Sequence, residues 1–308
     1  MFTAIQSVLA IIVVVAFGFY AGKRKIVSNE LSGSFSTLVM QFTFPAVLFT
    51  SIAQTSVDKL LNIRFIIAFF FSLMTLYFVV FIISNKVLKR SPQVSAMVAF
   101  TCSFPNMAFM GIPYLTEVLG SDTLLSVAIG NVISSVVMIP LTVLFLEKNT
   151  SAGPSTNVFK RELMKLIKKP LIIAPVLGII VAFLHIPMPQ FFMKGLHILG
   201  EATSPVALFT LGLMMTKFKF KLSLDAVADM GLKLIIQPLS AIAFVLIFGL
   251  SGKFAAEIII LTAMPTAVIV SMFSEKYNVY KEETVSAIIG GSVLSIITLV
   301  IFTVLSPS

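Results

Sequence analysis

The sequence predicts an all-α protein that crosses a membrane ten times, as two five-helix halves of opposite orientation. Three observations predict this fold: an apolar composition, ten apolar stretches and a weak similarity between the halves. Hydrophobic residues make up 58% of the 308 residues and charged residues only 11%, against about 45–50% and about 25% in soluble domains. One soluble core could not bury so much apolar surface, so we expect a lipid bilayer to surround the chain.

The composition also excludes several classes of chemistry. The chain has one cysteine, Cys102, which excludes an internal disulfide and a thiolate metal cluster. Its two histidines, His185 and His197, are too few for a typical zinc or iron site. Apart from the spacing of His197 and Glu201, we find neither a catalytic set nor the filter repeats or charge rings of a channel. We therefore expect no enzyme, no channel, no metal and no cofactor.

The chain contains ten stretches of the length that a membrane-spanning helix needs, about 20 mostly apolar residues. A longer polar segment, 147–169, holds NTSAGPSTN and then KRELMKLIKK, and we interpret it as a cytoplasmic linker with a short basic amphipathic piece. It separates a first repeat, 1–146, from a second, 170–308. The expected spans 1 to 10 are 4–22, 34–54, 63–85, 94–119, 122–146, 170–185, 190–216, 224–250, 254–274 and 283–305.

The distribution of lysine and arginine predicts the orientation, because these residues mark cytoplasmic loops. Of 22 such residues, seventeen lie in the loops after the odd-numbered spans, four lie on the other side and Lys233 lies inside span 8. We therefore expect a multi-pass protein of the cell membrane with both termini outside. The net charge of +9 is then an orientation signal, and we expect no nucleic-acid partner. The first span lacks a preceding basic segment, so we expect it to remain uncleaved.

The two halves resemble each other when one is shifted by 160 residues. Because five is odd, two similar halves must point in opposite directions, which is the inverted repeat of many secondary transporters. TFPAVLFT at 43–50 aligns with TSPVALFT at 203–210, with five of eight residues identical. Only 18 of 148 positions match overall, so a coincidence among small and apolar residues stays the alternative. Other matched pairs are Pro105 with Pro265, Gly18 with Gly178, Gly130 with Gly290 and Gln41 with Glu201.

Spans 4 and 9 each contain a proline, Pro105 and Pro265, that is expected to break the helix. Proline has no amide hydrogen and clashes with the carbonyl four residues earlier, and freed backbone groups are costly in hydrocarbon unless something satisfies them. If the two breaks cross near the midplane, each presents a half-helix N-terminus with partial positive charge. Such ends attract anions. The alternative is that both prolines only kink packed helices.

Polar side chains flank both prolines, and two amides lie in the neighbouring spans 5 and 8. Hydroxyls and amides both donate and accept hydrogen bonds, so they suit a carboxylate ligand. The predicted substrate-binding residues are Ser103, Pro105, Asn106, Asn131, Gln237, Thr262, Pro265 and Thr266.

Glu201 in span 7 is a candidate for a coupling proton or cation, together with its repeat counterpart Gln41. If span 7 starts near Gln190, Glu201 lies about 16 Å deep, and carboxylates at that depth mark pathways or ion sites. The alternatives are that Glu201 lies near the outer interface or is paired structurally. His197, four residues earlier on the same face, is expected to pack without such a role.

Three charged residues recur every fourth position at the cytoplasmic end of span 8: Asp225, Asp229 and Lys233. Residues four apart are neighbours on a helix surface. The spacing predicts a ladder of ion pairs at the membrane interface rather than a binding site.

Four segments together resemble the auxin efflux carrier family, which includes plant auxin exporters and bacterial malate and malonate permeases. They are SFPNMAFMGIP, KPLIIAPVLGII, TSPVALFTLGL and TAMPTAVIVSMFSEKYN, in spans 4, 6, 7 and 9. The resemblance covers nearly the whole chain. It implies a ten-helix carrier with inverted repeats, a scaffold domain, a transport domain and crossing helices 4 and 9 that break at proline.

The same resemblance implies that Pro105 and Asn106 contact the substrate. Bacterial relatives often carry an asparagine shortly after the span 9 proline, whereas this chain has Val268, Ile269 and Val270 there, so one polar contact is missing. The long central loop of the plant carriers is also absent. A bacterial organic-acid carrier is therefore a better match than a hormone exporter.

The resemblance implies a secondary transporter that moves a small organic anion, such as malate, malonate or an auxin-like acid, across the plasma membrane by alternating access. It leaves open a homodimer and coupling to a proton, to sodium or to neither. The alternative is a sodium-coupled symporter of the bile acid/sodium family type, whose topology is similar. That alternative needs a cation site, to which Glu201 and Gln41 could contribute, although no dense cluster of polar oxygens occurs.

Overall fold

The computed structural model describes residues 2–54, 62–147, 170–216 and 221–307, together with Met164 and Lys168. Every regular element among these residues is a helix. Six continuous helices are long and apolar enough to cross a membrane, which confirms an all-α polytopic membrane protein. They are Leu31–Ala53, Ile63–Val87, Leu124–Leu146, Gln190–Met215, Leu224–Ile247 and Lys281–Leu305. Most of the predicted linker at 147–169 lies outside the described residues.

The other four expected spans also correspond to helices. Span 1 is α1 (Phe2–Lys23) and span 6 is α11 (Pro170–Leu184). Spans 4 and 9 are each divided in two. Span 4 comprises α6 (Pro92–Ser103) and then η3 (Met107–Gly111) with α7 (Ile112–Leu119), and span 9 comprises α16 (Gly252–Ala263) and α17 (Ile269–Tyr277). The count of ten membrane crossings stays a prediction.

The long spans are built from several helical segments in series. Span 2 comprises α2 (Leu31–Leu38), η1 (Val39–Thr43) and α3 (Phe44–Ala53), and span 3 comprises α5 (Ile63–Ile82) and η2 (Ile83–Val87). Span 5 comprises η4 (Ser121–Thr123), α8 (Leu124–Ile133), η5 (Ser134–Met138) and α9 (Ile139–Leu146). Span 7 comprises α12 (Gln190–Glu201) and α13 (Thr203–Met215). Span 8 comprises α14 (Leu224–Gly231), η6 (Leu232–Ile236) and α15 (Gln237–Ile247), and span 10 is α18 (Lys281–Leu305).

Prolines explain most of the π-helical segments in these spans. Such a segment precedes Pro45, Pro113, Pro140 and Pro238, each of which is the second residue of the α-helix that follows. A proline cannot donate to the carbonyl four residues earlier and its ring clashes there. Widening the preceding turn to the i→i+5 pattern relieves that clash while keeping the helix continuous. The segment η2 has no such proline and is the exception.

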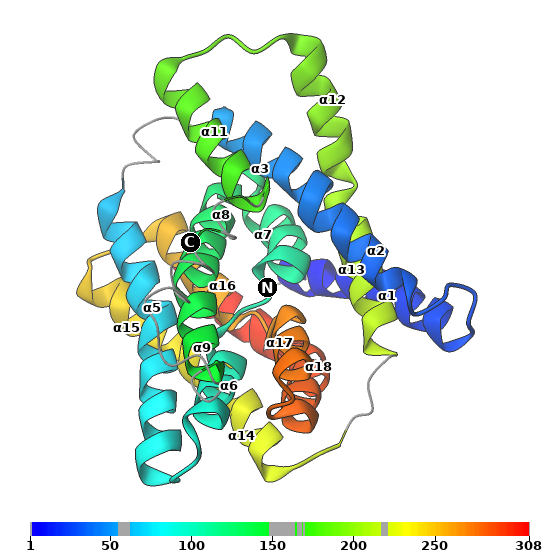
Figure 1. Cartoon of the computed structure of the whole chain (residues 1–308). Coiled ribbons are helices and arrows are strands. Elements are labelled where there is room, and N and C mark those ends of the chain that lie inside the picture. The colour runs from blue at the N-terminus through cyan, green and yellow to red at the C-terminus, as the bar shows by residue number, and fades with distance from the viewer. Residues whose placement is uncertain are drawn as a thin grey trace.

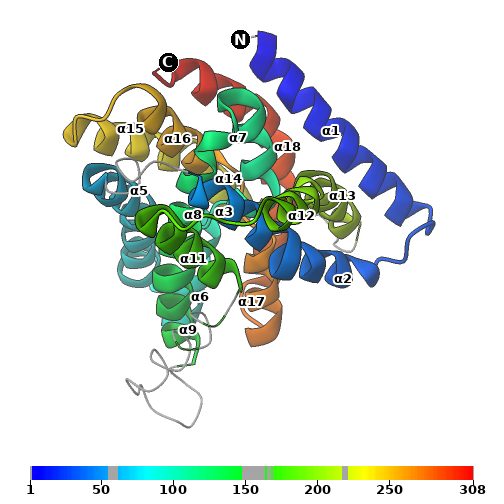
Figure 2. The same cartoon turned by 90° about the horizontal axis from the view of Figure 1, so that it is seen from above.

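The helices form two groups. Figure 1 shows α1, α2, α3, α11, α12 and α13 along the top and the right, and α5, α6, α9, α14, α15, α17 and α18 along the left and the bottom. Figure 2 shows α1 along an outer edge of the molecule. Within the first group α1 packs along α13 and α11 packs along α3, and within the second α5 packs against α6 and α15. We call the first set the α1–α13 group. The second set, together with the other segments of spans 3, 4, 5, 8, 9 and 10, is the α5–α18 group.

Glycines allow two helices of the α1–α13 group to touch backbone to backbone. A Cβ atom added to Gly18 of α1 would lie 2.0 Å from the carbonyl oxygen of Phe209, and one added to Gly212 of α13 would lie 2.0 Å from that of Val15. Small residues at helix interfaces serve this purpose in membranes, where close packing replaces the hydrophobic effect. The α1–α13 pair therefore depends on both glycines.

Candidate functional site

Two spans are interrupted at the prolines that the sequence singles out. Helix α6 (Pro92–Ser103) ends before Pro105, and the chain resumes as η3 (Met107–Gly111) and α7 (Ile112–Leu119). Helix α16 (Gly252–Ala263) ends before Pro265 and resumes as α17 (Ile269–Tyr277). Each residue before a proline is extended, Phe104 at φ −94° and ψ 99° and Met264 at φ −59° and ψ 145°. A residue before proline avoids the helical region for steric reasons.

The two interruptions lie against each other and satisfy each other's backbone. An isolated antiparallel bridge joins Pro105 and Thr266. The amide of Asn106 donates to the carbonyl of Pro265 at 2.8 Å, and the amide of Ala267 donates to the carbonyl of Phe104 at 3.0 Å. We call residues 104–106 and 264–268 the crossover. Pairing between the two breaks supplies the backbone hydrogen bonds that the lipid hydrocarbon cannot supply.

The hydroxyl of Thr266 satisfies the carbonyl that Pro105 leaves free. In an unbroken helix the amide of residue 105 would donate to the carbonyl of Thr101, but proline has no such amide. The Oγ1 atom of Thr266 donates to that carbonyl at 2.8 Å, and both residues are buried. Thr266 is thus a structural part of the crossover.

Replacing Thr266 with valine, which keeps the shape and removes the hydroxyl, is expected to lower the free energy of unfolding by about 1–3 kcal/mol, because the carbonyl of Thr101 stays buried without a partner. The apparent melting temperature in detergent measures this. The matched control is Ser240→Ala, which removes a half-buried hydroxyl that only bonds within its own helix. Equal melting temperatures for both variants would contradict the assignment.

Two side chains of span 8 donate hydrogen bonds to carbonyls at the C-terminal ends of the broken helices α6 and α16. The side chain of Gln237 donates from Nε2 to the carbonyl of Ser103 at 2.9 Å. One turn earlier, Lys233 donates from Nζ to the carbonyl of Thr262 at 2.8 Å. The last carbonyls of a helix have no partner within it, and a cation is favoured beside that negative end of the helix dipole. Gln237 and Lys233 therefore act as side-chain caps for α6 and α16.

Several side-chain atoms at or next to the crossover have no hydrogen-bond partner among the described residues. Asn106 is 1% exposed, yet neither Nδ2 nor Oδ1 of its side chain makes a hydrogen bond to them. The same holds for Oγ of Ser103 and Oε1 of Gln237. Each such atom costs about 1–3 kcal/mol when left unsatisfied. These atoms are therefore free to bind a ligand or water.

A cavity of about 60 Å³ lies beside these atoms, lined by Pro105, Asn106, Asn131, Val268 and Ile269 among others. It has room for water but not for a dicarboxylate without movement of its walls. Asn131 donates from Nδ2 to the carbonyl of Val127 at 2.9 Å. The hydroxyl of Thr262 donates within its own helix, to the carbonyls of Ile258 and Ile259. The structure thus brings five of the eight predicted binding residues to the crossover or to this cavity: Pro105, Asn106, Asn131, Pro265 and Thr266. Ser103 and Thr262 lie at the ends of α6 and α16, and Gln237 caps α6. The role of all eight in binding stays a prediction.

The two predicted coupling residues line different cavities. Glu201 ends α12 with its side chain 67% exposed, and its Oε1 atom lies 3.4 Å from Nδ1 of His197, whose side chain is also exposed. Both line a polar cavity of about 550 Å³ between α3, α12 and α13 on one side and α7, η4 and α8 on the other. Gln41 lines a separate, mainly apolar cavity of about 600 Å³. Gln41 and Glu201 therefore line different cavities, and their role in coupling stays a prediction.

The predicted ion-pair ladder on span 8 is wrong. Asp225 accepts from Nη2 of Arg90 at 2.7 Å, Asp229 accepts from Sγ of Cys102 at 3.3 Å, and Lys233 caps α16. These partners come from other elements, because this face of span 8 packs against α6 and α16 instead of facing solvent. Packing against other helices thus determines the partners of these charged side chains, and their spacing along the helix does not.

Sequence reasoning also missed the buried ionisable residues. Lys233 and Asp229 are 1% and 2% exposed. Glu257 of α16, also buried, accepts a hydrogen bond from the hydroxyl of Ser126 in α8. The signal was present, since Lys233 and Glu257 each interrupt an apolar stretch, and ionisable residues inside membrane spans are functional candidates by default.

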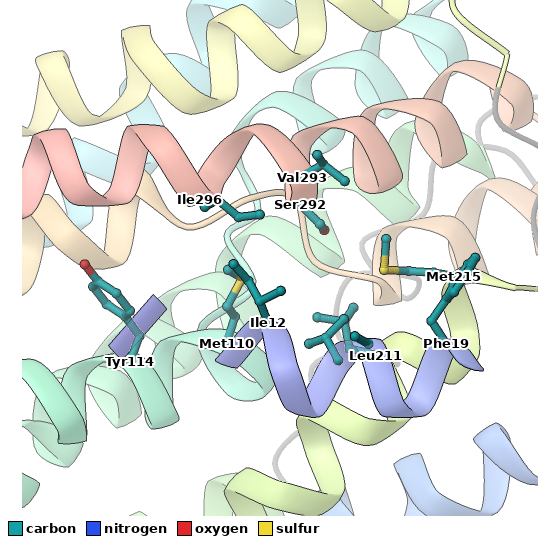
Figure 3. A pocket seen from close by; sticks show the side chains of 11 residues that line it. Ile12, Phe19, Met110, Tyr114, Leu211, Met215, Ser292, Val293 and Ile296 are labelled. Carbon is teal, nitrogen blue, oxygen red and sulfur yellow. The ribbon is translucent and has the colours of Figure 1, made fainter. Parts of the chain in front are cut away.

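A further cavity, which is almost entirely apolar, lies between the two helix groups. It measures about 280 Å³ and is lined by α1 and α13 on one side and by η3, α7 and α18 on the other. Figure 3 shows Ile12 and Phe19 of α1 facing Met110, Ser292 and Ile296 across this space. This cavity and the polar cavity at Glu201 both lie between the α1–α13 group and the α5–α18 group, so packing between the groups is incomplete at these cavities.

Comparison with known proteins gives matches along nearly the whole chain. Residues 3–303 match a family described as membrane transport protein. An uncharacterized transporter of Escherichia coli K12, YfdV, is 27% identical over 90% of this chain and 89% of its own length. A putative malonate transporter of Rhizobium meliloti is 21% identical over 88% and 85%. Auxin efflux carrier component 5 of Arabidopsis thaliana is 23% identical over 98% and 96%.

Proposed function

The chain belongs to the membrane transport protein family, which includes the auxin efflux carriers, and on that premise we propose that it is a secondary transporter of small organic anions. The membership confirms the family resemblance of the four sequence segments. It also confirms that the chain is not an enzyme, because the family is one of transporters. The proposal goes further in assigning the substrate class, the site and the mode of movement.

The proposed architecture is ten membrane-spanning helices in two inverted repeats, 1–146 and 170–308, with both termini outside the cell membrane. The packing supports it. At the shift of 160 residues span 1 corresponds to span 6 and span 7 to span 2, so the α1–α13 contact and the α11–α3 contact are equivalent. Gly18 and Gly178, which the shift aligns, lie at these two contacts. In this scheme the α1–α13 group is the scaffold and the α5–α18 group moves.

The observation that carries the proposed function is the unpaired, buried side chain of Asn106 at a crossover of two broken helices. Its amide nitrogen can donate to a carboxylate, and its backbone already has partners within the crossover. The half-helices that begin after the crossover present positive dipole ends, and the amine of Lys233 donates to the carbonyl of Thr262 beside it. An anion is the ligand that such surroundings favour.

Movement between the two groups supplies alternating access in this proposal. The polar cavity at His197 and Glu201 lies between the groups and leads from the surface toward the span that carries Asn106, since Ile112 and Thr116 of α7 line it. Rocking of one group against the other would close this cavity and open the opposite side, as inverted-repeat carriers do. The apolar cavity of Figure 3 leaves room for that movement.

We favour a small carboxylate as the substrate. The relatives include a protein named as a putative malonate transporter and several named as auxin efflux carriers, and malonate and auxins share a carboxylate group. The crossover offers amides and hydroxyls rather than several buried arginines, which suits a substrate that must leave again. The apolar residues Val268 and Ile269 beside the cavity leave Asn106 as its main amide donor.

Uptake into proteoliposomes tests the proposal. Purified protein is expected to take up at least one of radiolabelled malonate, malate and indole-3-acetate under a proton, sodium or voltage gradient, and to exchange it across the membrane without a gradient. Protein-free liposomes are the control. If the protein neither takes up nor exchanges any of these acids, the proposed function is rejected. Strict dependence of uptake on sodium would favour the symporter of the bile acid/sodium type.

A further inference from the structure

A buried group of titratable side chains lies between the crossover and the end of span 8 that carries Asp225. Asp229 is one turn after Asp225, and Lys233 is one turn after Asp229 and caps the broken helix α16. The side chain of Asp225 is 42% exposed and paired with Arg90, whereas Asp229 and Lys233 are buried. Asp225 therefore lies outside the buried part of this helix face, and Asp229 and Lys233 are the residues inside it.

The carboxyl group of Asp229 is only half satisfied. Its Oδ1 atom accepts from the thiol of Cys102, while its Oδ2 atom has no hydrogen-bond partner among the described residues. No ion pair within 4.0 Å joins it to Lys233 in the described part of the chain, where Nζ of Lys233 donates to Thr262. A carboxylate buried without full hydrogen bonding is costly, and a bound proton removes that cost.

Further titratable groups face Asp229 from each element around it. Cys102 approaches from α6, Arg90 from the segment before α6, and Tyr280 from the turn before α18. Burial and the negative charges of Asp229 and Asp225 raise the pKa of the Tyr280 hydroxyl, which therefore stays neutral. Glu282 at the start of α18 is exposed and paired with Lys221 at 2.7 Å. Asp229 and Lys233 are thus the buried charged residues of span 8, and Lys233 reaches the end of α16 beside the crossover.

We propose that Asp229 is a proton-binding site that couples proton movement to anion transport, with Lys233 as the fixed positive charge between it and the crossover. A proton adds to the free Oδ2 atom and converts the carboxylate to a neutral carboxyl group. This inference rests on the proposed function and replaces Glu201 as the coupling residue.

Charge balance explains the coupling. When Asp229 is neutral, the charge of Lys233 is uncompensated and offsets one negative charge of an anion bound at the crossover. When Asp229 is ionised, Asp229 and Lys233 compensate each other, and a bound anion would add its full negative charge to the buried region. Because unbalanced charge is expensive away from water, proton and anion bind together and leave together. The chain is therefore a proton–anion symporter.

The test compares gradient-driven accumulation with exchange in proteoliposomes, with radiolabelled malonate as the probe and the membrane potential held at zero. With two pH units across the membrane, the wild type is expected to accumulate malonate up to about 100-fold, since each pH unit contributes a factor of ten. Asp229→Asn should keep exchange at equal pH but lose the accumulation. Asp225→Asn, one turn away and outside the buried group, is the matched control and should accumulate normally.

The outcomes separate the two claims. Absence of both uptake and exchange in the wild type counts against the proposed function. Wild-type exchange without accumulation, or accumulation by Asp229→Asn, overturns the role of Asp229. Lys233→Gln, which can still donate to the carbonyl of Thr262, should also lose accumulation, whereas normal accumulation by this variant would remove Lys233 from the scheme.

The only cysteine of the chain gives a second measurement that does not require transport. The thiol of Cys102 donates to Oδ1 of Asp229, so its S–H stretching band should shift when that carboxylate binds a proton. We expect the infrared band to move as pH is lowered in the wild type and in Asp225→Asn, and to stay fixed in Asp229→Asn. If the position of the band does not change with pH in the wild type, or changes equally in Asp229→Asn, the inference is overturned. This holds even if Asp229→Asn transports nothing.

Discussion

Replacing Asn106 with alanine is expected to reduce the initial rate of uptake by about tenfold to 100-fold, because a hydrogen bond to a charged ligand is worth about 1.5–3 kcal/mol. The backbone of Asn106 bonds to Pro265 in the crossover and to Met110 and Gly111 in η3, and the substitution leaves these bonds in place. Its side chain bonds to none of the described residues. The loss should therefore fall on transport and not on folding.

Two comparisons make this result decisive. The melting temperature and yield of Asn106→Ala should match or exceed those of the wild type, since the variant removes two unsatisfied buried atoms. Ser95→Ala, in the first part of the same span, removes another buried hydroxyl without a partner but lies far from the crossover in the chain, and its uptake should equal that of the wild type. Unchanged uptake by Asn106→Ala would remove this residue from the site.

Replacing Gly212 with alanine is expected to lower the free energy of unfolding by about 1–3 kcal/mol or more, the usual cost of overpacking. The new methyl group would lie 2.0 Å from the carbonyl oxygen of Val15 and 2.7 Å from the amide nitrogen of Phe19. Both are backbone atoms of α1, which cannot turn aside as a side chain can. Helix α1 must therefore shift away from α13.

Gly195→Ala is the matched control for that variant. Gly195 lies in α12 of the same span, and a Cβ atom there meets nothing within 4 Å. In a helix alanine is favoured over glycine by about 1 kcal/mol, so this variant should melt at or above the wild-type temperature. Apparent melting temperatures in the same detergent test the pair. A Gly212→Ala variant as stable as Gly195→Ala would show that α1 and α13 are not in such close contact.

Local rules were sufficient for the course of the main chain. The helix breaks at Pro105 and Pro265 were predictable because proline affects its own amide and the residue before it, whatever lies elsewhere in the chain. The helical ranges followed from the length of each apolar stretch. Even the π-helical segments before four prolines have this local origin, although the sequence reasoning did not anticipate them.

The candidate site was predictable only in part. The residues around both prolines were found because they adjoin the breaks, and the crossover brings them together. The charges of span 8 were misread because an i,i+4 pattern describes neighbours on one helix and is blind to other helices. Cys102 is 127 positions from Asp229, and Thr262 is 29 positions from Lys233. Neither distance in the chain carries a signal in a single sequence.

The sequence by itself determined that the chain is a helical membrane protein, where its apolar stretches lie and where two of them break, since composition and proline act on nearby backbone. The tertiary structure alone decided that Lys233 caps a helix from another span, that Asp229 keeps a free oxygen and that Gly212 touches the backbone of α1. Burial and hydrogen-bond partners depend on which helices meet in space. That meeting is decided by packing over the whole molecule, not by neighbours along the chain.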